Sequence, residues 1–132
     1  MIIETRNQST ETRMSDFKFD FENLKAYQKS LEFIDKIFGI YKKLDSQYTY
    51  SIGSNLIRAG LSIANNLAEG NGKQSKRERK RYFNIASDSA RECVSVINVL
   101  KRQRLIEDNL YHEIRIDARE ITSIIRGLID SQ

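Results

Sequence analysis

Apolar residues recur every three or four positions along most of this chain, with polar residues between them. This spacing is typical of amphipathic α-helices. It predicts helices over about residues 22–44, 51–69, 75–102 and 108–129. The sequence has no strand pattern of any weight and no proline, which favours long uninterrupted helices. Four helices with short connections predict an all-α fold, an antiparallel up-down-up-down four-helix bundle.

The first predicted helix carries two apolar stripes that together span roughly 200° of its surface. A heptad seam is formed by Leu24, Tyr27, Leu31, Ile34, Phe38 and Tyr41, and a second stripe by Phe33, Ile37, Ile40 and Leu44. A helix in an isolated bundle needs less apolar width than this. We therefore expect the second stripe, with the slim glycine- and alanine-rich face of the second helix, to form a subunit interface. The alternative is a wide core face beneath the N-terminal segment.

The chain divides by composition into a flexible tail, residues 1–20, and a bundle domain, residues 21–132. The tail is mostly polar, as disordered segments are. At its end Phe17, Phe19 and Phe21 alternate with charged residues in a short extended pattern. We interpret these phenylalanines as a strap on the bundle or on a neighbouring subunit.

The second and third helices are predicted to meet at a glycine-rich corner. Gly70 and Gly72 indicate a helix end, with one of them in the left-handed conformation that glycine tolerates. Ser75 and Glu78 have the spacing of a capping box, which predicts that Ser75 caps the next helix.

A dense basic cluster follows this corner. Six cations fall within nine residues: Lys73, Lys76, Arg77, Arg79, Lys80 and Arg81. A helix N-terminus prefers acidic side chains, so local stability does not explain the cluster. At helical spacing Lys73, Lys76, Arg77 and Lys80 share one side. The cluster is either a binding surface for nucleic acid or an acidic partner, or a solvated helix face.

Length and charge set the remaining limits. The chain has 132 residues, enough for one domain with a real core, and a net charge of +4. A single cysteine excludes an internal disulfide and suits a reducing cytoplasm, where we expect the protein to act. No stretch approaches the roughly twenty apolar residues of a membrane span, and the start shows no signal-peptide pattern.

Candidate catalytic residues are few. His112 is the only histidine and is expected on a helix surface, and Cys93 falls on an apolar face as a buried structural thiol. Glu69 is interpreted as a structural carboxylate that pairs with Arg58 or with the cations of residues 76–81, or that caps the third helix. No nucleotide-binding glycine loop or paired metal motif is present, so we expect no enzymatic activity, metal or cofactor.

The segment Ser62–Gly70, with the glycine, serine and glutamate positions after it, resembles the signature of the 23S rRNA intervening-sequence protein family. The residues that carry this motif include Asn66, Glu69, Gly70, Gly72, Ser75 and Glu78. Residues 21–29 resemble the opening of the same family. The resemblance implies a four-helix bundle that assembles into a cyclic homo-oligomer, as in homopentameric relatives. The family is also similar to the accessory variability determinant of diversity-generating retroelements, a basic pentameric barrel that binds a reverse transcriptase and nucleic acid.

Two functional hypotheses follow. The first is a non-enzymatic, homo-oligomeric module, most simply a pentamer, that binds RNA, DNA or a ribonucleoprotein partner such as a reverse transcriptase through the basic corner. The alternative is a protein–protein adaptor whose basic corner docks an acidic protein surface.

Overall fold

The computed structural model describes residues 16–132, which fold almost entirely into helices. The four long helices are α1 (Lys25–Lys43), α3 (Ser54–Asn71), α4 (Lys76–Arg102) and α5 (Asp108–Asp130). A 3-10 turn, Asp20–Asn23, precedes α1. The short helix α2 (Ser46–Tyr48) and a π-helix, Thr49–Gly53, connect α1 to α3. The described chain contains no strand.

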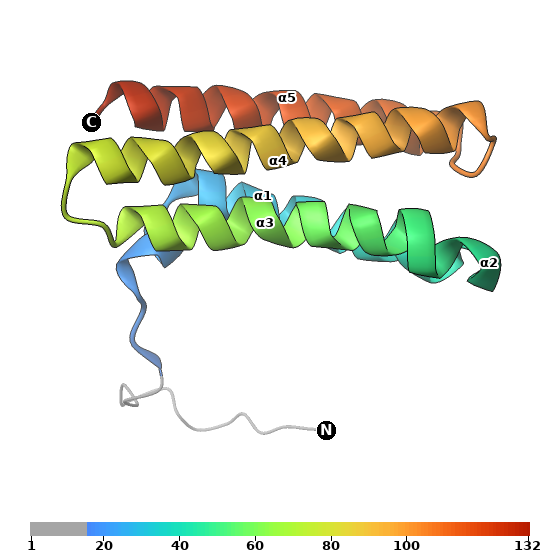
Figure 1. Cartoon of the computed structure of the whole chain (residues 1–132), viewed down its shortest axis with the longest axis horizontal. Coiled ribbons are helices and arrows are strands. Elements are labelled where there is room, and N and C mark those ends of the chain that lie inside the picture. The colour runs from blue at the N-terminus through green and yellow to red at the C-terminus, as the bar shows by residue number, and fades with distance from the viewer. Residues whose placement is uncertain (1–15) are drawn as a thin grey trace.

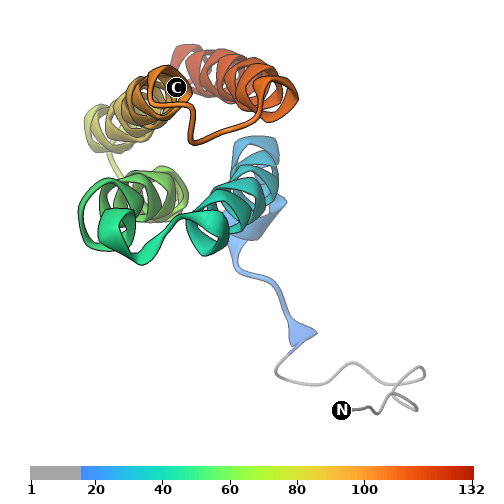
Figure 2. The ribbon, with the colours of Figure 1, turned by 90° about the vertical axis from the view of Figure 1, so that its right-hand side faces the viewer.

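Successive long helices run in opposite directions along the length of the molecule (Figure 1). Seen along the helix axes, α1 lies beside α3 and α5, and α4 lies beside the same two helices (Figure 2). This arrangement confirms the predicted all-α, antiparallel up-down-up-down four-helix bundle.

The core runs the full length of the bundle and takes apolar residues from all four long helices. Its largest fully buried side chains are Phe33, Ile37, Leu56, Ile63, Leu67, Phe83, Ile97, Leu100, Ile114, Ile121 and Ile125. Within each helix these residues are mostly three or four positions apart, or a multiple of that spacing, so each helix turns one continuous face inward.

The two stripes of α1 do not divide as predicted: the second stripe lies in the core, and the heptad seam is split between a buried Ile34 and exposed residues. Phe33, Ile37 and Ile40 of the second stripe are buried in the core of the single chain. Leu31 and Phe38 of the heptad seam are 44% and 38% exposed. The predicted subunit interface through the second stripe is therefore wrong, because α1 is rotated so that this stripe faces α3 and α5.

The slim face of α3 also lies inside the bundle. Gly60 is buried, and a β-carbon placed there would lie 3.0 Å from Ile37 Cδ1. Ala59 and Ala64 on the same face are buried as well. These small residues let α1 and α3 approach each other closely, which is the packing role that Gly60 predicts, and they are not available to a second subunit.

The connection between α1 and α3 is helical rather than the loop expected over residues 45–50. Side-chain hydroxyls stabilise its irregular turns: Thr49 donates to the Ser46 carbonyl at 2.9 Å, and Ser54 donates to the Thr49 carbonyl at 2.8 Å. Polar composition suggested a loop here, yet these hydroxyls bond back to the helix carbonyls of their own turns.

The turn between α4 and α5 holds the left-handed residue of this structure. Arg104 has a φ of 60°. Leu105 N–H donates to the Leu100 carbonyl at 2.9 Å, and Arg104 N–H donates to that of Lys101 at 3.1 Å. These two bonds form a Schellman motif, which closes α4. Glu107 is the N-cap of α5, and Asp108, an acidic residue of the kind that often caps a helix, is the first helical residue instead.

The N-terminal phenylalanines contact the bundle only in part. Phe21 packs edge-on against Tyr27, with ring centroids 5.0 Å apart. Phe17 and Phe19 are 62% and 54% exposed, on a segment that leads away from the helices (Figure 1). Phe21 therefore lies on the bundle as predicted, and a strap of Phe17 and Phe19 on a neighbouring subunit stays a prediction. Residues 1–15 of the predicted tail lie outside the described residues.

Candidate functional site

The corner between α3 and α4 forms without a left-handed glycine. None of the chain's six glycines, all of them within the described residues, has a positive φ; Gly72 ends α3 at φ −88° and ψ −4°. The prediction of a positive φ at Gly70 or Gly72 is therefore wrong. The chain turns nonetheless, because Ser75 is extended, at φ −87° and ψ 143°, before α4 begins.

Gly70 has a different role, which is close packing. It is buried, and a β-carbon on it would lie 2.7 Å from Tyr82 Cβ and 3.1 Å from Phe83 Cε1. Real β-carbons do not approach that closely. The first turns of α4 can therefore cross the end of α3 only because residue 70 has no side chain. Gly72 has no such neighbour, since its β-carbon would meet only the Glu69 carbonyl oxygen at 3.7 Å.

Ser75 caps α4, as predicted. Its hydroxyl oxygen accepts a hydrogen bond from Glu78 N–H at 3.1 Å. In the second half of a capping box, the Ser75 main-chain N–H would donate to the Glu78 carboxylate. That carboxylate instead accepts from Arg81 Nη2 at 3.2 Å and Nε at 3.3 Å. The hydrogen bonds from Arg81 lower the pKa of Glu78 below its ordinary value.

Arg79 is part of the scaffold of the corner. Its Nη1 donates to the carbonyls of Lys73 at 2.9 Å and Gln74 at 2.7 Å. Its Nε donates to Gln132 Oε1 at 2.5 Å. One guanidinium thus ties the α3–α4 turn to the end of the chain, a role that its place in a basic cluster does not reveal.

Two further cations of the cluster are also engaged. Lys73 forms an ion pair with Glu69 at 3.4 Å, and its ammonium lies 5.2 Å from the ring centroid of Tyr82. Arg81 bonds to Glu78 and stacks on the same ring, at 4.5 Å. Tyr82 therefore holds two cations on its faces by cation–π attraction, which sequence reasoning missed.

The other three cations, Lys76, Arg77 and Lys80, form what we call the corner patch. All three are exposed, and none has a side-chain hydrogen bond or ion pair to any residue in 16–132. They lie in the first two turns of α4, where the helix dipole adds positive potential. Of the four cations predicted to share one side of the helix, Lys73 is paired with Glu69, so three remain without a partner.

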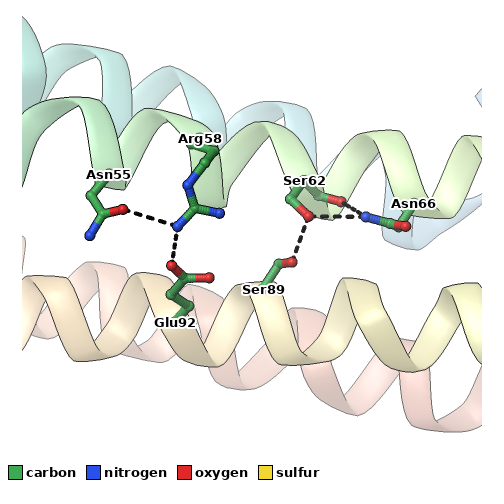
Figure 3. A network of polar contacts seen from close by, with 6 residues as sticks. All are labelled: Asn55, Arg58, Ser62, Asn66, Ser89 and Glu92. Atoms are coloured by element: carbon green, nitrogen blue, oxygen red, sulfur yellow. Dashed lines mark hydrogen bonds and ion pairs between the residues drawn. The ribbon is translucent and has the colours of Figure 1, made fainter.

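The motif residue Asn66 belongs to a polar network along the α3–α4 seam (Figure 3). Its Nδ2 donates to the Ser62 carbonyl at 2.8 Å and to Ser62 Oγ at 3.0 Å, and the Ser62 and Ser89 hydroxyls are 2.7 Å apart. In the same seam Arg58 donates to Glu92 and, at 3.0 Å, to Asn55.

Because Arg58 bonds to Glu92, the expected pairing of Glu69 with Arg58 is wrong. The partner of Glu69 is Lys73, one turn along the chain. Glu69 is thus a structural carboxylate, as predicted, but its partner lies before the cations of residues 76–81 that the sequence suggested. It does not cap α4, since Ser75 does so.

The remaining candidate residues have the positions that the sequence predicted. His112 is exposed on α5, with Nε2 3.7 Å from Asp108. Cys93 is fully buried, and that burial raises the pKa of its thiol to about 12. The described residues contain no group of three or more histidine, cysteine or acidic side chains placed to hold a metal ion. None of the described helices combines the length and the apolarity needed to cross a membrane.

Comparison with known proteins agrees with the resemblance carried by the corner motif. The family model for 23S rRNA-intervening sequence proteins matches residues 22–127. One similar solved structure comes from Bacteroides thetaiotaomicron and is described as a protein of unknown function from the S23 ribosomal protein family. The TM-score is 0.74 and the sequence identity 30%, over 79% of this chain and 97% of that one. A search of curated proteins finds no significant match. Since the family model spans all four long helices, the chain belongs to the 23S rRNA-intervening sequence protein family.

Proposed function

We propose that this protein is a non-enzymatic binding module that engages the phosphates of RNA or DNA through the corner patch, Lys76, Arg77 and Lys80. The observation that carries the proposal is the difference between these three cations and the rest of the cluster. Lys73 and Arg81 are each paired with a carboxylate, and Arg79 is bonded to main-chain and side-chain oxygens. The corner patch has no internal partner within residues 16–132.

Local helix stability does not account for three unpaired cations at this place. Positive charge in the first turns of a helix opposes the macrodipole. The same dipole adds to the attraction for a phosphate, because main-chain N–H groups point outward there. A phosphate backbone that meets these cations releases condensed counterions, which favours binding at low salt without any reading of bases.

The test is a gel-shift series over salt with the variant Lys76→Gln, Arg77→Gln, Lys80→Gln. For duplex DNA, each phosphate contact contributes about 0.9 to the slope of log affinity against log salt. Loss of three contacts should therefore make the slope shallower by about 2.7. The matched control is Lys42→Gln, Lys43→Gln, Arg102→Gln. It removes the same charge from exposed cations in the last turns of α1 and α4, where the dipole is negative.

An unchanged slope and affinity in the folded corner variant would refute the assignment of the corner patch. Absence of any nucleic-acid binding by the natural protein at low salt would leave the adaptor hypothesis in front. In that case an acidic protein retained by the natural chain, and lost by the same variant, identifies the alternative function.

We also propose that the protein assembles into a homo-oligomer, with a pentamer as the expected form, through an apolar face of α1 and α3. Leu31, Phe38 and Leu61 on this face are 44%, 38% and 40% exposed. Phe38 and Leu61 line a cleft of about 430 Å³, together with Tyr41 and Ile57. Contiguous exposed apolar surface of this kind marks an interaction site.

Light scattering at micromolar concentration tests the assembly. The variant Phe38→Glu, Leu61→Lys should dissociate the oligomer while the helix content by circular dichroism stays the same. A monodisperse natural protein near 15.4 kDa would refute the proposal.

A further inference from the structure

A second cationic surface, distinct from the corner, lies in a groove between α4 and α5. The groove has a volume of about 410 Å³. Arg91 on α4 and Arg115 and Arg119 on α5 line it, over a floor that includes Ala90, Val94 and Ala118. Two small residues, Ala90 and Ala118, lie at its base and are buried.

No carboxylate neutralises these arginines. Asp108, at the start of α5, pairs with Lys101 of α4 at 3.1 Å, away from the groove. The three acids in the middle of α5 point to its other neighbour, α1: Lys36 pairs with Glu113 and Asp117, each at 2.5 Å, and Lys29 pairs with Glu120 at 3.5 Å. In the part of the chain that the structure describes, none of the three groove arginines forms an ion pair. The helix α5 is thus divided into an acidic side toward α1 and a basic side toward α4.

A polar group in the groove is held ready for a ligand. Asn98 Oδ1 accepts from Arg115 Nη1 at 2.9 Å and from Tyr111 OH at 3.2 Å. Two donors on the oxygen fix the orientation of the amide, so its nitrogen keeps two free N–H donors among the described residues. The Arg115 guanidinium also lies over the Tyr111 ring, 5.4 Å from its centroid, which restrains the arginine.

This set of groups matches the chemistry of one nucleotide. Planar guanidinium groups bind phosphate oxygens through paired hydrogen bonds and stack on flat rings. The half-buried side chain of Val94 gives a base an apolar surface, and the Asn98 amide offers donors to its polar edge. The volume lies at the lower end of the range of small-ligand pockets, about 300–1,000 Å³.

The groove also continues the corner patch. On α4, Arg77, Lys80 and Arg91 share one helix face, since they are three and eleven residues apart. Eleven residues correspond to about 16 Å along the helix. A strand whose phosphates meet the corner patch can therefore follow α4 into the groove.

We propose that the groove receives a nucleotide of a single-stranded nucleic acid, with the phosphate on Arg91 and Arg119 and the base against Val94. This proposal rests on the proposed function, since it names the form of nucleic acid that the same surface binds. A duplex keeps its bases paired and stacked, so it can meet the corner patch but cannot place a base in the groove.

The experiment measures fluorescence anisotropy with a labelled twelve-nucleotide single strand and with the duplex of the same sequence. The groove variant is Arg91→Gln, Arg119→Gln, and its control is Lys42→Gln, Lys43→Gln, which removes the same charge from another exposed place. We expect the groove variant to lose about tenfold or more in affinity for the single strand and to change little for the duplex. Its salt slope on the single strand should be shallower by about 0.7, because both arginines contact the same phosphate.

A charge-conserving variant, Arg91→Lys, Arg119→Lys, separates the groove from general electrostatics. It should keep the salt slope and still lose affinity, because lysine lacks the planar paired donors. A groove variant that binds the single strand as tightly as the control would overturn the inference. If the groove variant weakens binding of the single strand while the corner variant does not, the assignment of the corner patch is wrong and the groove remains the proposed site.

The natural chain is also titrated with free AMP. Displacement of the labelled strand by AMP supports a site for a nucleotide unit. Binding of AMP without any binding of the strand would overturn the single-strand assignment and make the groove a free-nucleotide site.

Discussion

Replacement of Gly70 by alanine is the sharpest test of how the corner is built. The new β-carbon would lie 2.7 Å from Tyr82 Cβ, an atom fixed to the α4 main chain. It would also lie 3.1 Å and 3.2 Å from two ring carbons of Phe83, a core residue. A side-chain tip can rotate away from such a contact, but a β-carbon cannot. The end of α3 and the start of α4 must therefore move apart.

The cost follows from two opposed terms. Overpacking of a tight contact costs about 1–3 kcal/mol, and the rigidity of this one puts it in the upper half of that range. Alanine in place of glycine inside a helix stabilises the folded state by about 1 kcal/mol. We therefore expect Gly70→Ala to lower the free energy of unfolding by about 1–2 kcal/mol, which for a chain of this length lowers Tm by roughly 3–8 °C.

Two other glycines provide matched controls. A β-carbon at Gly39 in α1 or at Gly127 in α5 would meet nothing within 4 Å. Gly39→Ala and Gly127→Ala should therefore raise the free energy of unfolding by up to about 1 kcal/mol. Urea denaturation followed by circular dichroism, at one fixed protein concentration, measures all three variants. Equal stability of Gly70→Ala and the two controls would refute the close-packing argument.

Three further predictions concern other parts of the bundle. Arg104→Gly should stabilise the protein by about 0.5–1 kcal/mol in the same urea assay, because relief of a left-handed β-carbon outweighs the added chain entropy; a loss of stability would contradict this. The pKa of Lys36 is raised above 10.5, first by its hydrogen bond to Asp117 and then by that to Glu113. The stabilisation from Lys36 is thus fully present below about pH 10.5 and is lost as pH rises through the folded pKa of Lys36. The difference in unfolding free energy between the natural chain and Lys36→Met should therefore shrink as pH rises above 10.5. A difference that stays constant with pH would contradict this role of Lys36. Burial raises the pKa of Cys93 to about 12, so a disulfide reagent at pH 8 should label this thiol only after unfolding, and rapid labelling of the native protein would be inconsistent with that burial.

Periodicity predicted the helices well because each one buries a continuous face. It could not say which stripe of α1 faces inward. Phe33 and Phe38 are both large and apolar, and the choice depends on the rotation of α1 against α3 and α5, which the sequence of α1 alone does not contain. The burial of the small face of α3 could not be predicted for the same reason, since Gly60 makes room for Ile37, a residue of another helix.

The basic cluster shows a second limit. Its six cations are adjacent in the sequence, but their partners are not all local. Arg79 donates a hydrogen bond to Gln132, fifty-three residues away. This bond gives Arg79 a structural role that the exposed cations of the cluster do not have. The glycine corner was misjudged for a related reason: Gly70 is required by a neighbouring helix rather than by its own main-chain conformation.

The polar network of Figure 3 has one more consequence, for the register between α3 and α4. Ser62 meets Ser89, and Arg58, one turn away on α3, meets Glu92, one turn away on α4. A slip of one turn, about 5.4 Å, would leave apolar contacts largely interchangeable but would break both polar pairs at once. The network thus fixes the axial position of the two helices. An insertion in the short connection between them would have to bulge outward, and the spacing of the cations along α4 would stay the same.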